Sequence, residues 1–127
     1  MREILFRGKT LDGDWIEGWY QPPAMGIGVT LAVFNDSSDY LTDIPVIPET
    51  IGEFTGVYDK NGKKIFEGDI VKFLFNYDVG CYPHTKTEVR RVIFAVGEFT
   101  PVSRIDCSSF EILGNIHDNP ELLEAMK

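Results

Sequence analysis

The chain has 127 residues, of which 43% are hydrophobic and 13% aromatic, so it is long enough for one domain with a single core. Twenty acidic and twelve basic residues give a formal net charge of −8; this argues against duplex DNA as a partner, because phosphate contacts need Lys and Arg. The sequence lacks the long apolar run of a membrane span or signal peptide, so we expect a cytoplasmic protein that has no membrane partner.

The first part of the chain, residues 1–49, predicts an N-terminal β-segment. Residues 3–9 and 15–21 are typical of two strands joined by a turn, and Gly18 inside the second indicates a bulge or a close backbone approach. Two more extended stretches follow at residues 29–34 and 40–47. Pro45 predicts that the last one lies at a sheet edge or bulge, because proline donates no backbone hydrogen bond.

Residues 50–73 predict the β-hairpin around which the chain is organised. Asn61-Gly62 lies between two apolar runs, and this pair favours a type I′ turn, in which both central residues have positive φ. Gly68 predicts a second turn or bulge. We expect Asp69 beside it to accept hydrogen bonds from nearby backbone N–H groups, a structural role.

The rest of the chain is predicted as short strands and one helix. Residues 76–85 have the composition of an exposed loop, and strands are expected at residues 87–96, 98–102 and 110–116. A short C-terminal helix should begin after Asn119, with Asn119 as its N-cap and Pro120 in the first helical position. The fold class is therefore all-β.

Three sequence blocks resemble the YopX family of phage and prophage proteins. They are FRGK with WIEG (residues 6–9 and 15–18), GEFTGVYDKNGKKIFEGDIV (52–71) and ILGNIHDNPELL (112–123). The resemblance implies a small, partly open SH3-like barrel over residues 50–127, with residues 1–49 as an added N-terminal β-segment in one domain, 1–127. It also implies a phage or prophage origin within a bacterial host cell. It implies no chemistry and no catalytic residues.

Two arrangements of reactive side chains are candidate sites. Cys81 and His84 have the spacing of zinc ligands, and Cys107 and His117 would complete a set of four; the wide spacing of the second pair argues against zinc, and we expect no cofactor. Glu67 and Asp69 would share one face of a strand, as the acid–base pair of a hydrolase requires.

The remaining candidates concern binding. Trp19 and Tyr20 are a possible partner surface, because aromatic residues are favoured at interface hot spots, although they also suit the core of a small β-domain. Arg90-Arg91 with Lys86 is the most basic stretch, but adjacent strand residues face opposite sides, which weakens a basic patch.

The sequence therefore predicts a non-enzymatic accessory protein that acts by protein–protein contact, with an unidentified protein partner and with homo-oligomers possible. Its negative charge suits a basic partner surface. The alternatives are a nucleic-acid-associated small barrel that stacks bases on aromatic side chains, and a hydrolase that uses Glu67 and Asp69.

Overall fold

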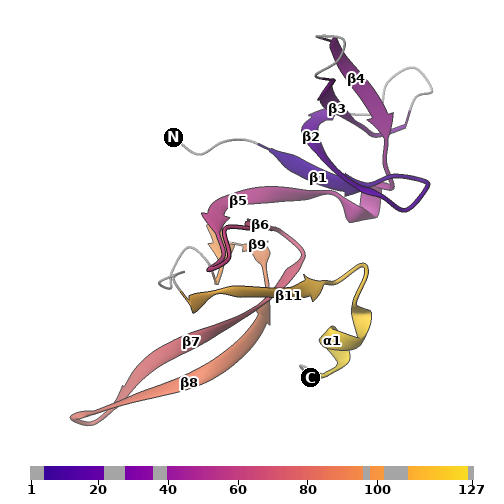
Figure 1. The fold of residues 1–127 in the computed structure, drawn as a ribbon. Helices are drawn as coiled ribbons and strands as arrows, with labels where there is room; N and C mark the ends of the chain where they lie inside the picture. Colours follow the sequence, from indigo (N-terminus) through magenta and orange to yellow (C-terminus); the bar gives the residue numbers. More distant parts are fainter. Residues whose placement is uncertain (1–4, 22–27, 36–39, 96–97, 102–108, 126–127) are drawn as a thin grey trace. The chain divides into compact units, whose positions relative to one another are not determined.

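A computed structural model describes residues 5–21, 28–35, 40–95, 98–101 and 109–125. They form two compact units, residues 1–54 and 55–127, which Figure 1 colours in sequence order. The described strands pair in antiparallel sheets that do not close into a barrel, and one short helix ends the chain. The all-β class is confirmed, while the SH3-like type and the single domain over residues 1–127 stay predictions.

The N-terminal unit is a meander of four strands, β1 (Phe6–Lys9), β2 (Trp15–Gln21), β3 (Thr30–Asn35) and β4 (Tyr40–Pro45). Their order in the sheet is β4-β3-β2-β1, and the start of β5 (Gly52–Tyr58) pairs with β1. Pro45 therefore lies in an edge strand, as predicted. The buried apolar side chains of this unit are spaced along the meander: Leu5, Leu31, Ala32, Val46 and Phe54.

Gly18 is needed because β2 and β3 approach closely. A β-carbon at this position would collide with the carbonyl oxygen of Ala32 in β3. The backbone approach expected from the sequence is confirmed. After β4, the 3-10 helix η1 (Pro48–Thr50) returns the chain to β1, where the Thr50 hydroxyl accepts a hydrogen bond of 2.8 Å from the Lys9 N–H.

The organising hairpin is formed by β5 and β6 (Lys64–Phe66), and its turn lies in the C-terminal unit. Gly62 has φ 82°, as predicted. The turn differs from the expected type I′ form, because the Gly62 N–H bonds to the Asp59 carbonyl oxygen at 3.0 Å. Lys60 and Asn61 are therefore the central residues, and Gly62 follows them in the left-handed conformation, as in three-residue hairpin loops.

We expect Gly62→Val to lower the free energy of unfolding by about 1–3 kcal/mol, because a β-branched residue is strained at positive φ. No atom lies within 4 Å of the position that a β-carbon would take at Gly62, so the cost is conformational rather than steric crowding with neighbours. Asn61→Gly is the control and should be nearly neutral. Urea denaturation of both variants checks this, and wild-type stability of Gly62→Val would contradict the turn assignment.

The largest error of the sequence prediction concerns residues 76–85, which are paired strands and not a loop. Strands β7 (Asp69–Val79) and β8 (Tyr82–Arg91) form one long antiparallel hairpin that turns at residues 80 and 81. Figure 1 shows it as an extended ribbon within the C-terminal unit. Its outer part is exposed on both faces, so its composition resembles a loop, while cross-strand pairing such as Tyr77 with His84 keeps it regular.

The predicted strand 87–96 is also interrupted, at Val92. This residue is fully buried, and its backbone bonds to Gly68 and Asp69 instead of continuing the ladder. Strands β9 (Ile93–Ala95) and β10 (Glu98–Thr100) then form a separate pair. One cluster of six buried apolar residues lies in the core of the C-terminal unit: Ile65, Val71, Phe73, Val92, Phe99 and Phe110.

The last elements are β11 (Glu111–Asn115), which pairs with β7, and the helix α1 (Pro120–Ala125). The helix begins where it was predicted. Asn119 precedes it, but the side-chain oxygen of Asn119 accepts a hydrogen bond from the Asn115 N–H at 3.3 Å. This residue therefore ties the start of the helix to the end of β11.

Candidate functional site

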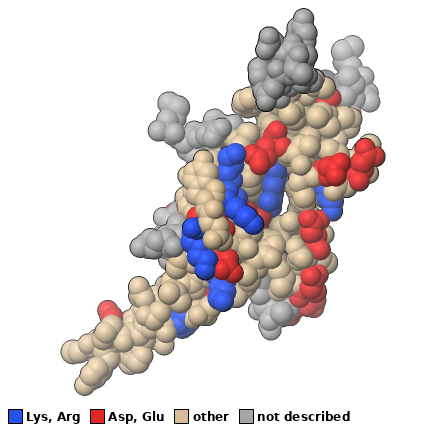
Figure 2. All heavy atoms as spheres, viewed as in Figure 1, with Lys and Arg blue, Asp and Glu red and all other residues tan. Residues whose placement is uncertain are grey.

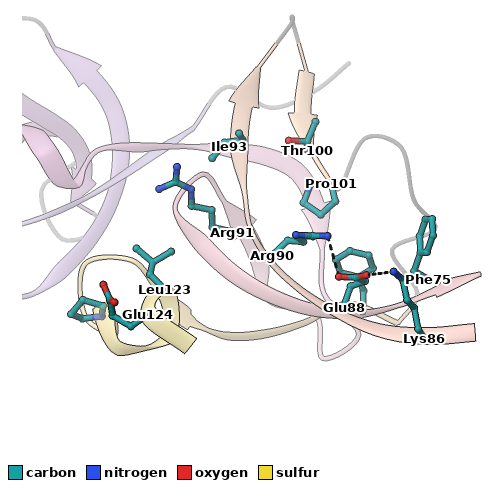
Figure 3. Close-up of a pocket in the computed structure, with 12 residues that line it drawn as sticks. Phe75, Lys86, Glu88, Arg90, Arg91, Ile93, Thr100, Pro101, Leu123 and Glu124 are labelled. Atoms are coloured by element: carbon teal, nitrogen blue, oxygen red, sulfur yellow. Dashed lines mark ion pairs between the residues drawn. The ribbon is translucent and has the colours of Figure 1, made fainter. Parts of the chain in front are cut away.

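A pocket of about 930 Å³ lies within the C-terminal unit. We call it the charged pocket, and Figure 3 shows the side chains around it, which come from β7, β8, β9, the end of β10 and α1. Its apolar lining residues are Phe73, Phe75, Ile93, Pro101, Pro120 and Leu123. Its charged lining residues are Lys86, Glu88, Arg90, Arg91 and Glu124. The volume is within the range of ligand-binding pockets.

Glu88 is the electrostatic centre of the charged pocket. Its carboxylate pairs with Lys86 Nζ at 2.7 Å and with Arg90 Nη2 at 3.2 Å, the two ion pairs drawn in Figure 3. The hydrogen bond from Lys86 and the charges of Lys86 and Arg90 hold the pKa of Glu88 below its usual value. Glu88 is therefore an anion that pairs with two cations, and not a proton donor near neutral pH.

Arg90 and Arg91 point in different directions, as strand alternation predicts, but both line the charged pocket. Arg91 is the last residue of β8. It forms no ion pair with the other residues around the pocket (Figure 3). The basic stretch noted in the sequence therefore does contribute to one site, which the alternation argument did not foresee.

An aromatic face extends along the β7–β8 hairpin beyond the charged pocket. We define it as Tyr77, Val79, Tyr82 and His84, which share one face because Tyr77 pairs with His84 and Val79 with Tyr82. The rings of Tyr77 and His84 stack with centroids 5.4 Å apart. Tyr82 is 73% exposed and Val79 57% exposed. In Figure 2 this end of the hairpin carries almost no charged side chains.

Of the two carboxylates proposed for a hydrolase, Asp69 is held inside the C-terminal unit. Asp69 is 1% exposed, and its Oδ2 accepts a hydrogen bond from the Phe66 N–H at 2.8 Å. Gly68 has φ 95° in the turn between β6 and β7. Both residues therefore lie where a structural role in the turn is expected, and that role stays a prediction. Neither Glu67 nor Asp69 lines the charged pocket, so a substrate there would not reach them.

The zinc hypothesis involves Cys81, His84, Cys107 and His117, and Cys107 lies outside the described residues. Cys81 is exposed in the turn of the β7–β8 hairpin and its thiol is free. Within the described part of the chain, no three His, Cys, Asp or Glu side chains are grouped so that they could hold a metal ion.

Among the described helices, none is long and apolar enough to cross a membrane.

Trp19 and Tyr20, the predicted partner surface, are 46% and 42% exposed in the N-terminal unit. The alternative that they are core aromatics is wrong. The Tyr20 ring lies against Phe6, with centroids 5.7 Å apart, and both side chains retain free surface for a contact.

The site residues that the sequence analysis missed are Phe75, Glu88 and the aromatic face. A signal was present: Phe73, Phe75, Tyr77 and Val79 alternate along the chain with the period of a strand. Because the sequence analysis assigned residues 76–85 to an exposed loop, it did not use this alternation to predict a strand.

These features define a small all-β protein with a charged, partly apolar pocket and an exposed aromatic hairpin. The family model described as YopX protein matches residues 27–124, which is more than half of the sequence. The chain therefore belongs to the YopX family, as the three sequence blocks indicated. A comparison with curated proteins found no match.

A comparison with solved structures found a similar fold in protein EF1440 from Enterococcus faecalis, known from a crystal structure. The two chains share 20% sequence identity, the match covers 97% of this chain and 99% of that chain, and the TM-score is 0.53. At this identity the similarity concerns the fold alone.

Proposed function

We propose that this chain is a non-enzymatic accessory protein of a phage or prophage that acts in the bacterial cytoplasm by binding a protein partner. The observation that carries the proposal is the aromatic face of the β7–β8 hairpin. Tyrosine is enriched in interface cores, where charged residues are depleted. Between residues 76 and 85 the only charged side chain is Asp78, and it alternates with the residues of the aromatic face.

Leaving the aromatic face exposed to water has a cost in free energy. Tyr77, Val79 and Tyr82 are all large and exposed, and burying such side chains stabilises a complex by about 25 cal/mol per Å² of apolar area. The hairpin backbone is already ordered by its cross-strand hydrogen bonds, so little conformational entropy is lost on binding. Trp19 and Tyr20 are proposed as a second contact surface, in the N-terminal unit.

The test is affinity capture from lysogenic bacteria with three baits. They are the wild type, a double variant that combines Tyr77→Ser and Tyr82→Ser, and the single variant Leu74→Ser. Leu74 is 51% exposed on the opposite face of β7, so it is a matched control for lost apolar surface. We expect a partner that wild type and Leu74→Ser retain and that the double variant recovers about tenfold less, since each hot-spot tyrosine contributes more than about 1 kcal/mol. Equal recovery by all three baits, or no partner, would contradict the proposal.

A nucleic-acid-associated function is the second candidate. The rings of Phe75, Tyr77 and His84 form a stack. Lys86 Nζ lies 5.7 Å from the Phe75 ring centroid and 5.6 Å from the Tyr77 ring centroid. Single strands bind to such combinations of aromatic faces and cations. The net charge of −8 opposes it, as it opposes duplex DNA. Salt-dependent binding of a single-stranded oligonucleotide that is lost in the Tyr77 and Tyr82 variant would favour this candidate.

A further inference from the structure

The charged pocket differs in character from the rest of the molecule. Three cations and two anions line it, so it has an excess of positive charge in a chain whose net charge is −8. The overall charge suits a basic partner, but this site suits an anionic group. Its apolar walls, which include Phe75, Ile93 and Leu123, suit an anionic group that is attached to an apolar one.

The distribution of ion pairs identifies where the anionic group would bind. Lys86 and Arg90 are both engaged by Glu88, whereas Arg91 has no ion-pair partner around the pocket (Figure 3). Arg91 is exposed, and a guanidinium group binds a carboxylate through two parallel hydrogen bonds. Arg91 is therefore the group available to an incoming anion, and Leu123 and Ile93 offer apolar surface at the same site.

A nucleic-acid strand fits the charged pocket poorly. It brings one phosphate charge per nucleotide and needs several cations, but here two of the three cations are already paired with Glu88, and Glu124 adds a further carboxylate. Base stacking also needs open aromatic faces. Phe73 is only 3% exposed, and Lys86 Nζ lies over the Phe75 ring.

We propose that the charged pocket binds a short segment of a partner protein in which acidic and apolar side chains alternate. A carboxylate of the segment pairs with Arg91, and its apolar side chains pack against Ile93 and Leu123. This proposal rests on the charged pocket alone, so it holds whether or not the aromatic face also binds a protein.

The test uses a fluorescent synthetic peptide of alternating Leu and Glu, with Leu–Gln and Leu–Lys peptides as controls, and measures the dissociation constant by anisotropy. Wild type should bind the Leu–Glu peptide most tightly, and more weakly as salt is raised. Arg91→Gln should weaken binding about threefold to fivefold, the size of one exposed ion pair. Glu88→Gln should strengthen it by a similar factor, because it releases Lys86 and Arg90 for the peptide.

Lys72→Gln is the matched control, because Lys72 is an exposed cation of β7 that does not line the charged pocket; it should leave the affinity unchanged. Circular dichroism verifies that each variant is folded. Equal binding of the Leu–Gln peptide, or equal losses in Arg91→Gln and Lys72→Gln, would overturn the proposal. Arg91-dependent binding of a single-stranded oligonucleotide or of inorganic phosphate, tighter than that of the Leu–Glu peptide, would overturn it as well.

Discussion

Phe110→Ala is expected to lower the free energy of unfolding by about 3–5 kcal/mol, the largest loss among the substitutions considered. The Phe110 side chain is fully buried at the centre of the C-terminal unit, and its ring lies 4.8 Å from that of Phe73, measured between centroids. Truncation to Ala removes this contact and leaves a cavity that the surrounding strands can fill only in part. Urea denaturation followed by circular dichroism gives the midpoint and slope that measure the loss.

Tyr82→Ala is the control, because it removes an aromatic side chain that is 73% exposed. Its effect should be within about 0.5 kcal/mol, as for most surface substitutions. Similar midpoints for Phe110→Ala and Tyr82→Ala would show that Phe110 is not part of the stabilising core.

The same experiment tests whether residues 1–127 fold as one domain. Both tryptophans, Trp15 and Trp19, lie in the N-terminal unit, so tryptophan emission follows that unit alone. If the chain is one cooperative domain, Phe110→Ala will shift the emission transition and the circular dichroism transition together. If the emission transition stays at its wild-type midpoint, the two units unfold independently and the single-domain prediction is wrong.

Local sequence signals were sufficient for the elements whose structure is determined within a few residues. Gly62 at positive φ, the turn at Gly68, the helix that starts after Asn119 and the strand 15–21 were all predicted. In each case the deciding interaction is between chain neighbours or is a conformational preference of one residue type.

The features that were missed depend on strand pairing and on residues from several elements. The outer β7–β8 hairpin is exposed on both faces, so its composition resembles a loop although Phe73, Phe75, Tyr77 and Val79 alternate, and its pairing is decided across the hairpin. The charged pocket needs β8, the end of β10 and α1 together. The sequence shows the cations Arg90 and Arg91, but it does not show which other elements lie beside them at the charged pocket.

Asp59 is the clearest case of a role that only the three-dimensional structure reveals. Its Oδ1 accepts hydrogen bonds of 2.9 Å from the Asn61 and Lys63 N–H groups, within its own turn. Its Oδ2 accepts a hydrogen bond of 3.3 Å from the Ile112 N–H, in β11. One carboxylate therefore shapes the organising hairpin and attaches it to a strand that follows about fifty residues later.

We expect Asp59→Ala to cost about 3 kcal/mol, because three hydrogen bonds to a largely buried carboxylate are lost at about 1 kcal/mol each. Asp59→Asn separates the contribution of the hydrogen bonds within the turn from that of the hydrogen bond from β11. Its single side-chain oxygen can keep the bonds within the turn, while its NH₂ group would face the Ile112 N–H, donor against donor. Asp59→Asn should therefore lose about half as much as Asp59→Ala, and equal losses would show that the contact with β11 is the only one that matters.

The contribution of Asp59 should also depend on pH in a defined direction. Burial, the largest single influence, raises the pKa of Asp59, but the N–H groups of Lys63, Ile112 and Asn61 with the charge of Lys63 outweigh it, so the pKa lies below its usual value of 3.8. A carboxyl group whose pKa is lower in the folded state stabilises the fold above its unfolded pKa, and this contribution is lost as pH falls through the folded value. The stability difference between wild type and Asp59→Asn should therefore be constant from neutral pH down to about pH 5 and shrink below about pH 4. Urea midpoints of the two proteins, measured across this pH range, test this prediction. A stability difference that grows as the pH is lowered would contradict the assignment of the charged Asp59 carboxylate as the hydrogen-bond acceptor.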